Sequence, residues 1–212
     1  MYLRLLPVLF VFASASSPQA PAPAPASPGD NPIGFSYRVP EDWQIVTPRA
    51  PSPSQQKRAQ QNVSSLEEKH GMECLQVTLT ARHGDPPSTI VVVALPFDCF
   101  GQRLNDRDLP GFGEGAAEGL KQAFDISSPI QASYPLASHK MWIERARAIP
   151  KGRPGPEYTV EIACTLLQKG IVCWMAQAAD AVGLRVFENG PVSLDGSSAP
   201  ALVPPDIFLG NR

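Results

Sequence analysis

The pattern of hydrophobic and polar residues predicts a body made mainly of β-strands. Alternation is clear at 34–39, where Phe35, Tyr37 and Val39 share one face. The segment 90–95 is apolar throughout, which is typical of an interior strand covered on both faces. Further strands are predicted at 43–46, 74–81, 130–136, 140–149, 158–167 and 171–178. In the strand at 74–81 the alternation places Leu75, Val77, Leu79 and Ala81 on the inward face.

Apolar residues recur at helical spacing in other segments. A helix is predicted at 110–124, because an apolar residue occupies every fourth position there, at Phe112, Ala116, Leu120 and Phe124. A polar helix is predicted at 54–70, and a short helix is predicted to follow Asp180 and to end near Glu188. The order of these elements predicts an α+β domain, an antiparallel β-sheet with helices packed on its faces.

The first residues resemble a signal for export. Arg4 precedes a short apolar run, and Ala13-Ser14-Ala15 fits a cleavage site, so a signal peptide is predicted over 1–15, cut after Ala15 or later, near Ala20. An uncleaved anchor or a buried strand is the alternative. The run is shorter than the roughly 20 residues that span a bilayer, so we expect no stable transmembrane anchor.

The predicted divisions of the chain follow from this leader. Residues 16–32 form a Pro/Ala-rich linker, which favours an extended tether. The folded domain is expected at 33–194 and a tail at 195–212. The expected localisation is periplasmic or secreted.

Composition and charge limit the classes of partner. The 212 residues are 43% hydrophobic and 18% charged, as in an ordinary globular domain, and the formal net charge is −2. Because no overall positive field draws in phosphates, nucleic acid is not an expected partner. One basic cluster, Arg145, Arg147, Lys151 and Arg153, crowds a predicted hairpin. It is a possible partner surface, and a solvated edge that discourages strand pairing is the alternative.

Four cysteines in an exported chain predict two disulfides. A two- or four-residue turn centred between Gln168 and Lys169 puts Cys164 opposite Cys173. The turn of the earlier hairpin brings Cys99 near Cys74, so the second predicted bridge is Cys74–Cys99. Free buried thiols are the main alternative. A metal or redox site is disfavoured because no two cysteines have C-x-x-C spacing.

Motifs for catalysis are absent from the sequence. It contains no Gly-x-Ser-x-Gly elbow and no His-Glu-x-x-His helix. The three histidines, His70, His83 and His139, are each expected in solvent at a helix end or turn. The glycine-rich 111–115 is interpreted as a flexible helix entry, and 105–108 as a polar turn rather than a calcium loop. We therefore assign no catalytic, cofactor-binding or metal-ligating residue and expect no cofactor. The protein is interpreted as non-enzymatic, and an enzymatic function is kept as the alternative.

Three features of the chain resemble the PsbP-like fold family. They are the mid-chain helix, the late hairpin closed by a short helix, and the opening segment Phe35-Ser36-Tyr37-Arg38-Val39-Pro40-Glu41-Asp42-Trp43. The resemblance covers 33–194 and implies a PsbP-like sandwich. The family is united by fold more than by chemistry, so it implies no single activity. We expect an exported binding or accessory domain of the cell envelope, whose partner is an unknown protein or envelope component. The alternatives are an envelope hydrolase without a recognisable motif and an inhibitor or immunity-type protein.

Overall fold

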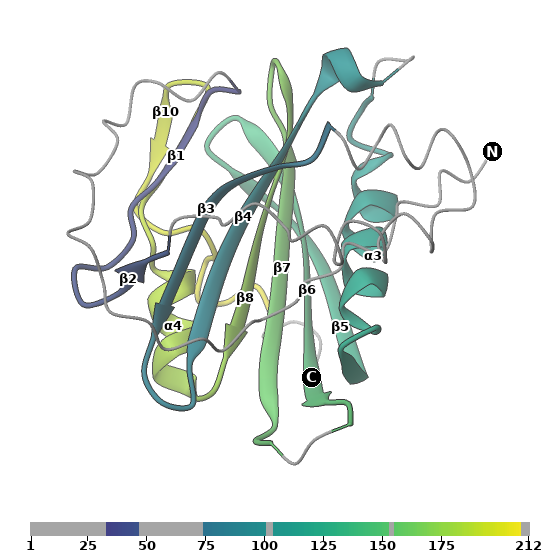
Figure 1. Ribbon diagram of the computed structural model, residues 1–212. Coiled ribbons are helices and arrows are strands. Elements are labelled where there is room, and N and C mark those ends of the chain that lie inside the picture. Colours follow the sequence, from purple (N-terminus) through teal and green to yellow (C-terminus); the bar gives the residue numbers. More distant parts are fainter. Residues whose placement is uncertain (1–32, 47–73, 101–103, 153–154, 209–212) are drawn as a thin grey trace.

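The computed structural model describes residues 33–46, 74–100, 104–152 and 155–208 (Figure 1). The strands in these ranges are β1 (Phe35–Tyr37), β2 (Gln44–Ile45), β3 (Gln76–His83), β4 (Ser88–Pro96), β5 (Phe124–Leu136), β6 (His139–Pro150), β7 (Tyr158–Leu166), β8 (Gly170–Ala178), β9 (Val192–Leu194) and β10 (Ser197–Ala199). The helices are α3 (Leu109–Leu120), α4 (Ala181–Glu188) and the short 3₁₀ helix η1 (Phe97–Cys99). The helix predicted at 54–70 lies outside the described residues.

Seven strands of the described residues form one antiparallel sheet in the order β2-β3-β4-β8-β7-β6-β5. β4 lies inside the sheet, and its residues from Ser88 to Leu95 are buried. The prediction of an interior strand at 90–95 is therefore confirmed. The α+β class, with helices packed on an antiparallel sheet, is also confirmed.

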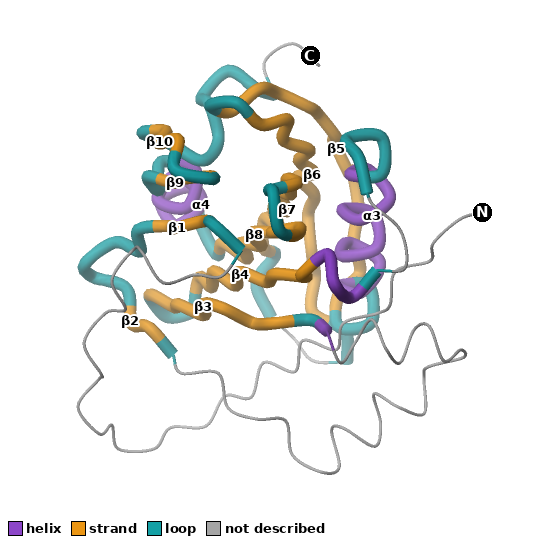
Figure 2. The backbone as a smooth tube through the Cα atoms, turned by 90° about the horizontal axis from the view of Figure 1, so that it is seen from above, coloured by secondary structure: helices purple, strands orange, loops and turns teal. Residues whose placement is uncertain are grey.

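Both faces of the large sheet are covered, so the domain has two apolar layers (Figure 2). α3 covers one face, where Phe112 and Leu120 pack with buried residues of β6, β7 and β8. α4 covers the other face, where its Phe187 joins the buried Trp174 of β8. The buried Phe187 anchors α4 in the same apolar cluster as Trp174 of β8, beside the pocket described below.

One glycine of α3 sets how closely this helix approaches the sheet. A Cβ on Gly113 would lie 1.9 Å from Cζ3 of Trp142, so a larger residue does not fit without movement. The segment 111–115, predicted as a flexible helix entry, lies inside the helix. The polar turn predicted at 105–108 precedes it, and the Asp108 carboxylate accepts a hydrogen bond from the Asn105 N–H at 2.8 Å.

α3 is shorter than its periodicity predicts. The apolar stripe extends to Phe124, yet the helix ends at Leu120 and β5 begins at Phe124. Phe124 remains buried, but as a strand residue: it pairs with Pro150, and its ring lies edge-on to Tyr158 at a centroid distance of 6.3 Å. Tertiary pairing therefore overrides the helical spacing at this end, and the strand predicted at 130–136 starts six residues earlier.

A β-bulge in β3 overturns the predicted single inward face of 74–81. The register shifts between Val77, which pairs with Val93, and Leu79, which pairs with Val92. Because an extra residue changes the side-chain alternation, Leu75 packs in the α3 layer and Leu79 in the α4 layer. Val77 is largely exposed.

A second, three-stranded sheet lies beside α4, in the order β1-β9-β10 (Figure 2). β1 pairs antiparallel with β9, so Phe35 lies opposite Leu194 although the two are far apart in sequence. The fold continues beyond Leu194, because β10 follows directly and both Leu202 and Val203 are buried in the α4 layer.

Candidate functional site

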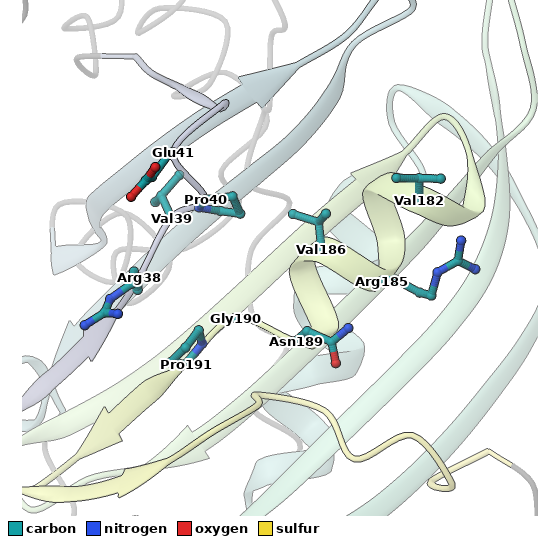
Figure 3. Close-up of a pocket in the computed structure, with 10 residues that line it drawn as sticks. All are labelled: Arg38, Val39, Pro40, Glu41, Val182, Arg185, Val186, Asn189, Gly190 and Pro191. Atoms are coloured by element: carbon teal, nitrogen blue, oxygen red, sulfur yellow. The ribbon is translucent and has the colours of Figure 1, made fainter.

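A pocket of about 400 Å³ lies between the chain segment after β1 and helix α4. We call it the α4 pocket; its lining residues are Arg38, Val39, Pro40, Glu41, Val182, Arg185, Val186, Asn189, Gly190 and Pro191. Figure 3 shows residues 38–41 on one wall and the α4 side chains on the other. The volume falls within the range of small-ligand and side-chain pockets.

Hydrogen bonds hold the two walls of the α4 pocket together. The Arg38 N–H donates to the Pro191 carbonyl at 3.0 Å, which extends the β1–β9 pairing. The Tyr37 hydroxyl donates to the carbonyl of Phe187 at 3.1 Å, and burial raises its pKa well above the usual range. At its start α4 is capped by Asp180, whose Oδ1 accepts from the Gly183 N–H at 2.7 Å, as predicted.

The α4 pocket combines an apolar centre with charged ends. Its valines and prolines come from both walls, and Val182 is 60% exposed. Arg38 and Arg185 are exposed on opposite walls (Figure 3). Among the described residues, neither makes an ion pair within 4 Å, and Glu41 is the single carboxylate of the lining.

A partly buried ionic cluster lies between the large sheet and the end of α4. Arg145 of β6 contacts two carboxylates: its Nε donates to Oε2 of Glu161 at 2.6 Å, and its Nη2 contacts Oε1 of Glu188. Burial raises the pKa of Glu161 to about 7 even though Arg145 opposes the shift. The pKa of Glu188 is raised for the same reason.

The C-terminal segment covers this ionic cluster. The guanidinium carbon of Arg145 lies 4.1 Å from the ring centroid of Phe208, a cation–π contact. The Tyr134 hydroxyl donates to the Leu202 carbonyl at 2.8 Å, and burial raises its pKa beyond the usual range. Sequence reasoning missed Glu161, although a lone carboxylate inside the apolar segment 158–167 is a signal that could have revealed it.

The basic cluster noted in the sequence is dispersed among acidic partners. Arg145 points into the ionic cluster, whereas Arg147 is exposed and lies 3.3 Å from Oε1 of Glu157. Lys151 donates to the Lys121 carbonyl at 2.6 Å and lies 3.6 Å from Oδ1 of Asp125. Arg153 lies outside the described residues. The role of these residues as a partner surface stays a prediction.

Both predicted disulfides are present: Cys74–Cys99 lies beyond the paired residues of β3 and β4, and Cys164–Cys173 lies within the β7–β8 register. Cys74 and Cys99 are bridged with a Cα–Cα distance of 5.9 Å. Cys164 and Cys173 lie directly opposite each other on β7 and β8, with a Cα–Cα distance of 4.2 Å, and both face the α3 layer. Disulfides of this kind are typical of proteins that work outside the reducing cytosol.

The histidines lie apart from the α4 pocket. His83 is exposed, stacks on Trp43 at a centroid distance of 5.8 Å and lies 3.3 Å from Oδ2 of Asp42. His139 is less exposed than expected, because Asp195 of the β9–β10 turn lies 3.6 Å from its Nε2. His70 lies outside the described residues. Within the described ranges, no group of three or more His, Cys, Asp or Glu side chains could hold a metal ion.

Fold and pocket together define an α+β domain with two disulfides and a ligand-sized pocket beside α4. No helix in the described part of the chain is long and apolar enough to cross a membrane. No family model matches the chain, and no curated protein matches it.

A distant resemblance to a solved structure concerns the fold. That structure is LpqN, described as involved in cell envelope biogenesis of Mycobacterium tuberculosis. The match covers 74% of this chain and 79% of LpqN, with 16% sequence identity and a TM-score of 0.40. At this level the likeness carries no argument about function, so the PsbP-like resemblance stays a prediction.

Proposed function

We propose that this chain is an exported, non-enzymatic binding domain of the cell envelope, and that it binds a partner protein through the α4 pocket. The observation that carries the proposal is the lining of that pocket, where valines lie with two exposed arginines that make no ion pair within 4 Å with any described residue. An apolar surface with a few polar groups around it is the usual form of a binding site.

Export is supported by two independent features of the chain. The leader at 1–15 has the sequence pattern of a signal peptide, although it lies outside the described residues. The two disulfides suit an oxidising compartment, either periplasmic or extracellular.

The chemistry of the lining favours binding over catalysis. Acid–base and nucleophilic catalysis require a nucleophile or a positioned proton donor and acceptor close together. The lining contains one carboxylate, Glu41, and no serine, cysteine, histidine or lysine. A binding role is therefore the simpler assignment for this pocket.

Position-dependent photo-crosslinking in the living host tests the proposal. A photoreactive amino acid replaces Val182 in the α4 pocket or, as a control, Ile149, which is comparably exposed but lies outside the lining. We expect a discrete protein adduct from position 182 that is absent from position 149 and disappears in the Arg38→Glu/Arg185→Glu variant. Equal adducts from both positions, or none from 182, would overturn the proposal.

A further inference from the structure

We infer that the α4 pocket takes an extended acidic segment of a partner protein, with an apolar side chain between the walls and carboxylates on Arg38 and Arg185. This inference rests on the proposed function and specifies the chemistry of the ligand. It follows from the charge, the openness and the available backbone groups of the pocket.

The charges of the lining are the first argument for an acidic ligand. Arg145 and Arg147 already have carboxylate partners, whereas Arg38 and Arg185 make no ion pair with any described residue. A guanidinium binds a carboxylate through two parallel hydrogen bonds, so each of these exposed arginines offers a specific site for an acidic side chain. The lining carries two arginines and one glutamate, although the whole chain is formally −2.

The apolar centre of the pocket is the argument that the ligand also inserts an apolar side chain. Val39 and Pro40 on one wall face Val182 and Val186 on the other (Figure 3). Burial of one aliphatic side chain here would remove these surfaces from water, at about 25 cal/mol per Å² of apolar area. The ligand must therefore alternate acidic and apolar groups, which a short peptide does.

The shape of the pocket favours a polymer over a small molecule. Small-ligand sites usually enclose about 70–90% of the ligand surface, whereas this pocket is more open than enclosed. An extended chain can lie across an open pocket and insert a single side chain. We therefore assign the occupant as a segment of protein.

The backbone of the 38–41 wall limits how that segment can be recognised. Arg38 already donates its N–H to Pro191, and Pro40 has no N–H to donate. Neither residue therefore donates a backbone hydrogen bond to the segment. Among the side chains, Glu41 is expected to disfavour an acidic residue at its end of the pocket.

Peptide selection on the full oxidised chain tests the inference. A random octapeptide library displayed on beads is the probe, and we expect enrichment of sequences with Asp or Glu on both sides of an aliphatic residue. The Arg38→Glu/Arg185→Glu variant should bind these peptides about tenfold or more weakly. Arg147→Glu, the matched control outside the pocket, should bind them as the unchanged chain does, and Glu41→Lys should bind them more tightly.

Two results would overturn the inference while leaving the proposed function in place. The first is a protein adduct at position 182 in cells together with peptides that are neutral or basic. The second is loss of acidic-peptide binding in Arg147→Glu but not in the double variant. Flotation of the chain with phosphatidylglycerol vesicles, abolished by the double variant, would instead assign the arginines to a lipid headgroup. Matching melting temperatures and intact disulfides in every variant exclude misfolding as the cause.

Discussion

Arg145 of β6 and Glu161 of β7 lie directly opposite each other in the large sheet and form an ion pair with an Nε–Oε2 distance of 2.6 Å. Glu161 is fully buried, and within the described structure its Oε1 has no hydrogen-bond partner. One guanidinium thus serves Glu161 and Glu188 together. Because desolvation outweighs this pairing, the pKa of Glu161 rises to about 7.

The first prediction concerns the dependence of stability on pH. The pKa of Glu161 rises from 4.5 in the unfolded reference to about 7 in the fold, so the folded protein holds this proton more tightly. The free energy of unfolding should therefore decrease as pH rises from about 4.5 through about 7. The raised pKa values of Glu144 and Glu188 act in the same direction. Urea unfolding across this range measures the slope.

Substitution of Glu161 identifies the source of that slope. Glu161→Gln removes the titrating group while keeping its size, so the decrease in unfolding free energy with pH should become smaller. Asp106→Asn, at an exposed carboxylate, is the control and should leave the slope unchanged. A slope that is equally steep in Glu161→Gln would show that the buried carboxyl is not responsible.

The second prediction compares two glycines of α3. Gly113→Ala places a Cβ against the Trp142 ring and should destabilise the fold by about 1–3 kcal/mol, as overpacking does. Gly111→Ala meets no atom within 4 Å and should stabilise it by up to about 1 kcal/mol, since alanine favours helix. Denaturant midpoints of the two variants measure both effects. Equal midpoints would contradict the close packing of Gly113 on Trp142.

The sequence predicted features that depend on local periodicity. Alternation along β7 and β8 and the position of the turn between them placed Cys164 opposite Cys173, because a strand repeats every two residues and a turn sets the register. The continuous apolar run of β4 likewise indicated an interior strand. These inferences need only neighbours in the sequence.

Features that depend on distant segments were not predicted. The α4 pocket joins residues 38–41 to residues 182–191, and the β1–β9 pairing that unites them leaves no periodic signal. The position of Arg145 opposite Glu161 depends on the register across the β6–β7 connection, whose length the sequence did not fix. The bulge in β3 was not predicted either, since apolar and polar residues alternate without interruption along 75–81 and give no sign of an extra residue.

The third prediction concerns the order in which the disulfides are reduced. Cys164 and Cys173 are buried in the α3 layer, whereas Cys74 and Cys99 are partly exposed. A thiolate must reach a sulfur to attack it, so mild dithiothreitol should reduce Cys74–Cys99 first in the folded protein. Alkylation followed by peptide mass spectrometry measures the order. Simultaneous loss of both bridges without unfolding would contradict the burial of Cys164–Cys173.

The last prediction concerns Phe208, which covers the guanidinium of Arg145. Phe208→Ala removes both the aromatic face and the apolar cover, so it should cost about 1 kcal/mol of stability. It should also admit water to the ionic cluster and lower the pKa of Glu161 from about 7 toward 4.5, because burial is the main cause of the shift.

Phe208→Leu separates the two contributions of the ring. Leucine keeps an apolar cover without a π face, so this variant should lose the cation–π energy but retain the raised pKa of Glu161. Carbon-13 detected titration of the Glu161 carboxyl measures the pKa in each variant, and denaturant unfolding measures the stability. An unchanged pKa in Phe208→Ala would show that the C-terminal segment does not control the hydration of the cluster. In that case the strands and α4 alone account for the burial of Glu161.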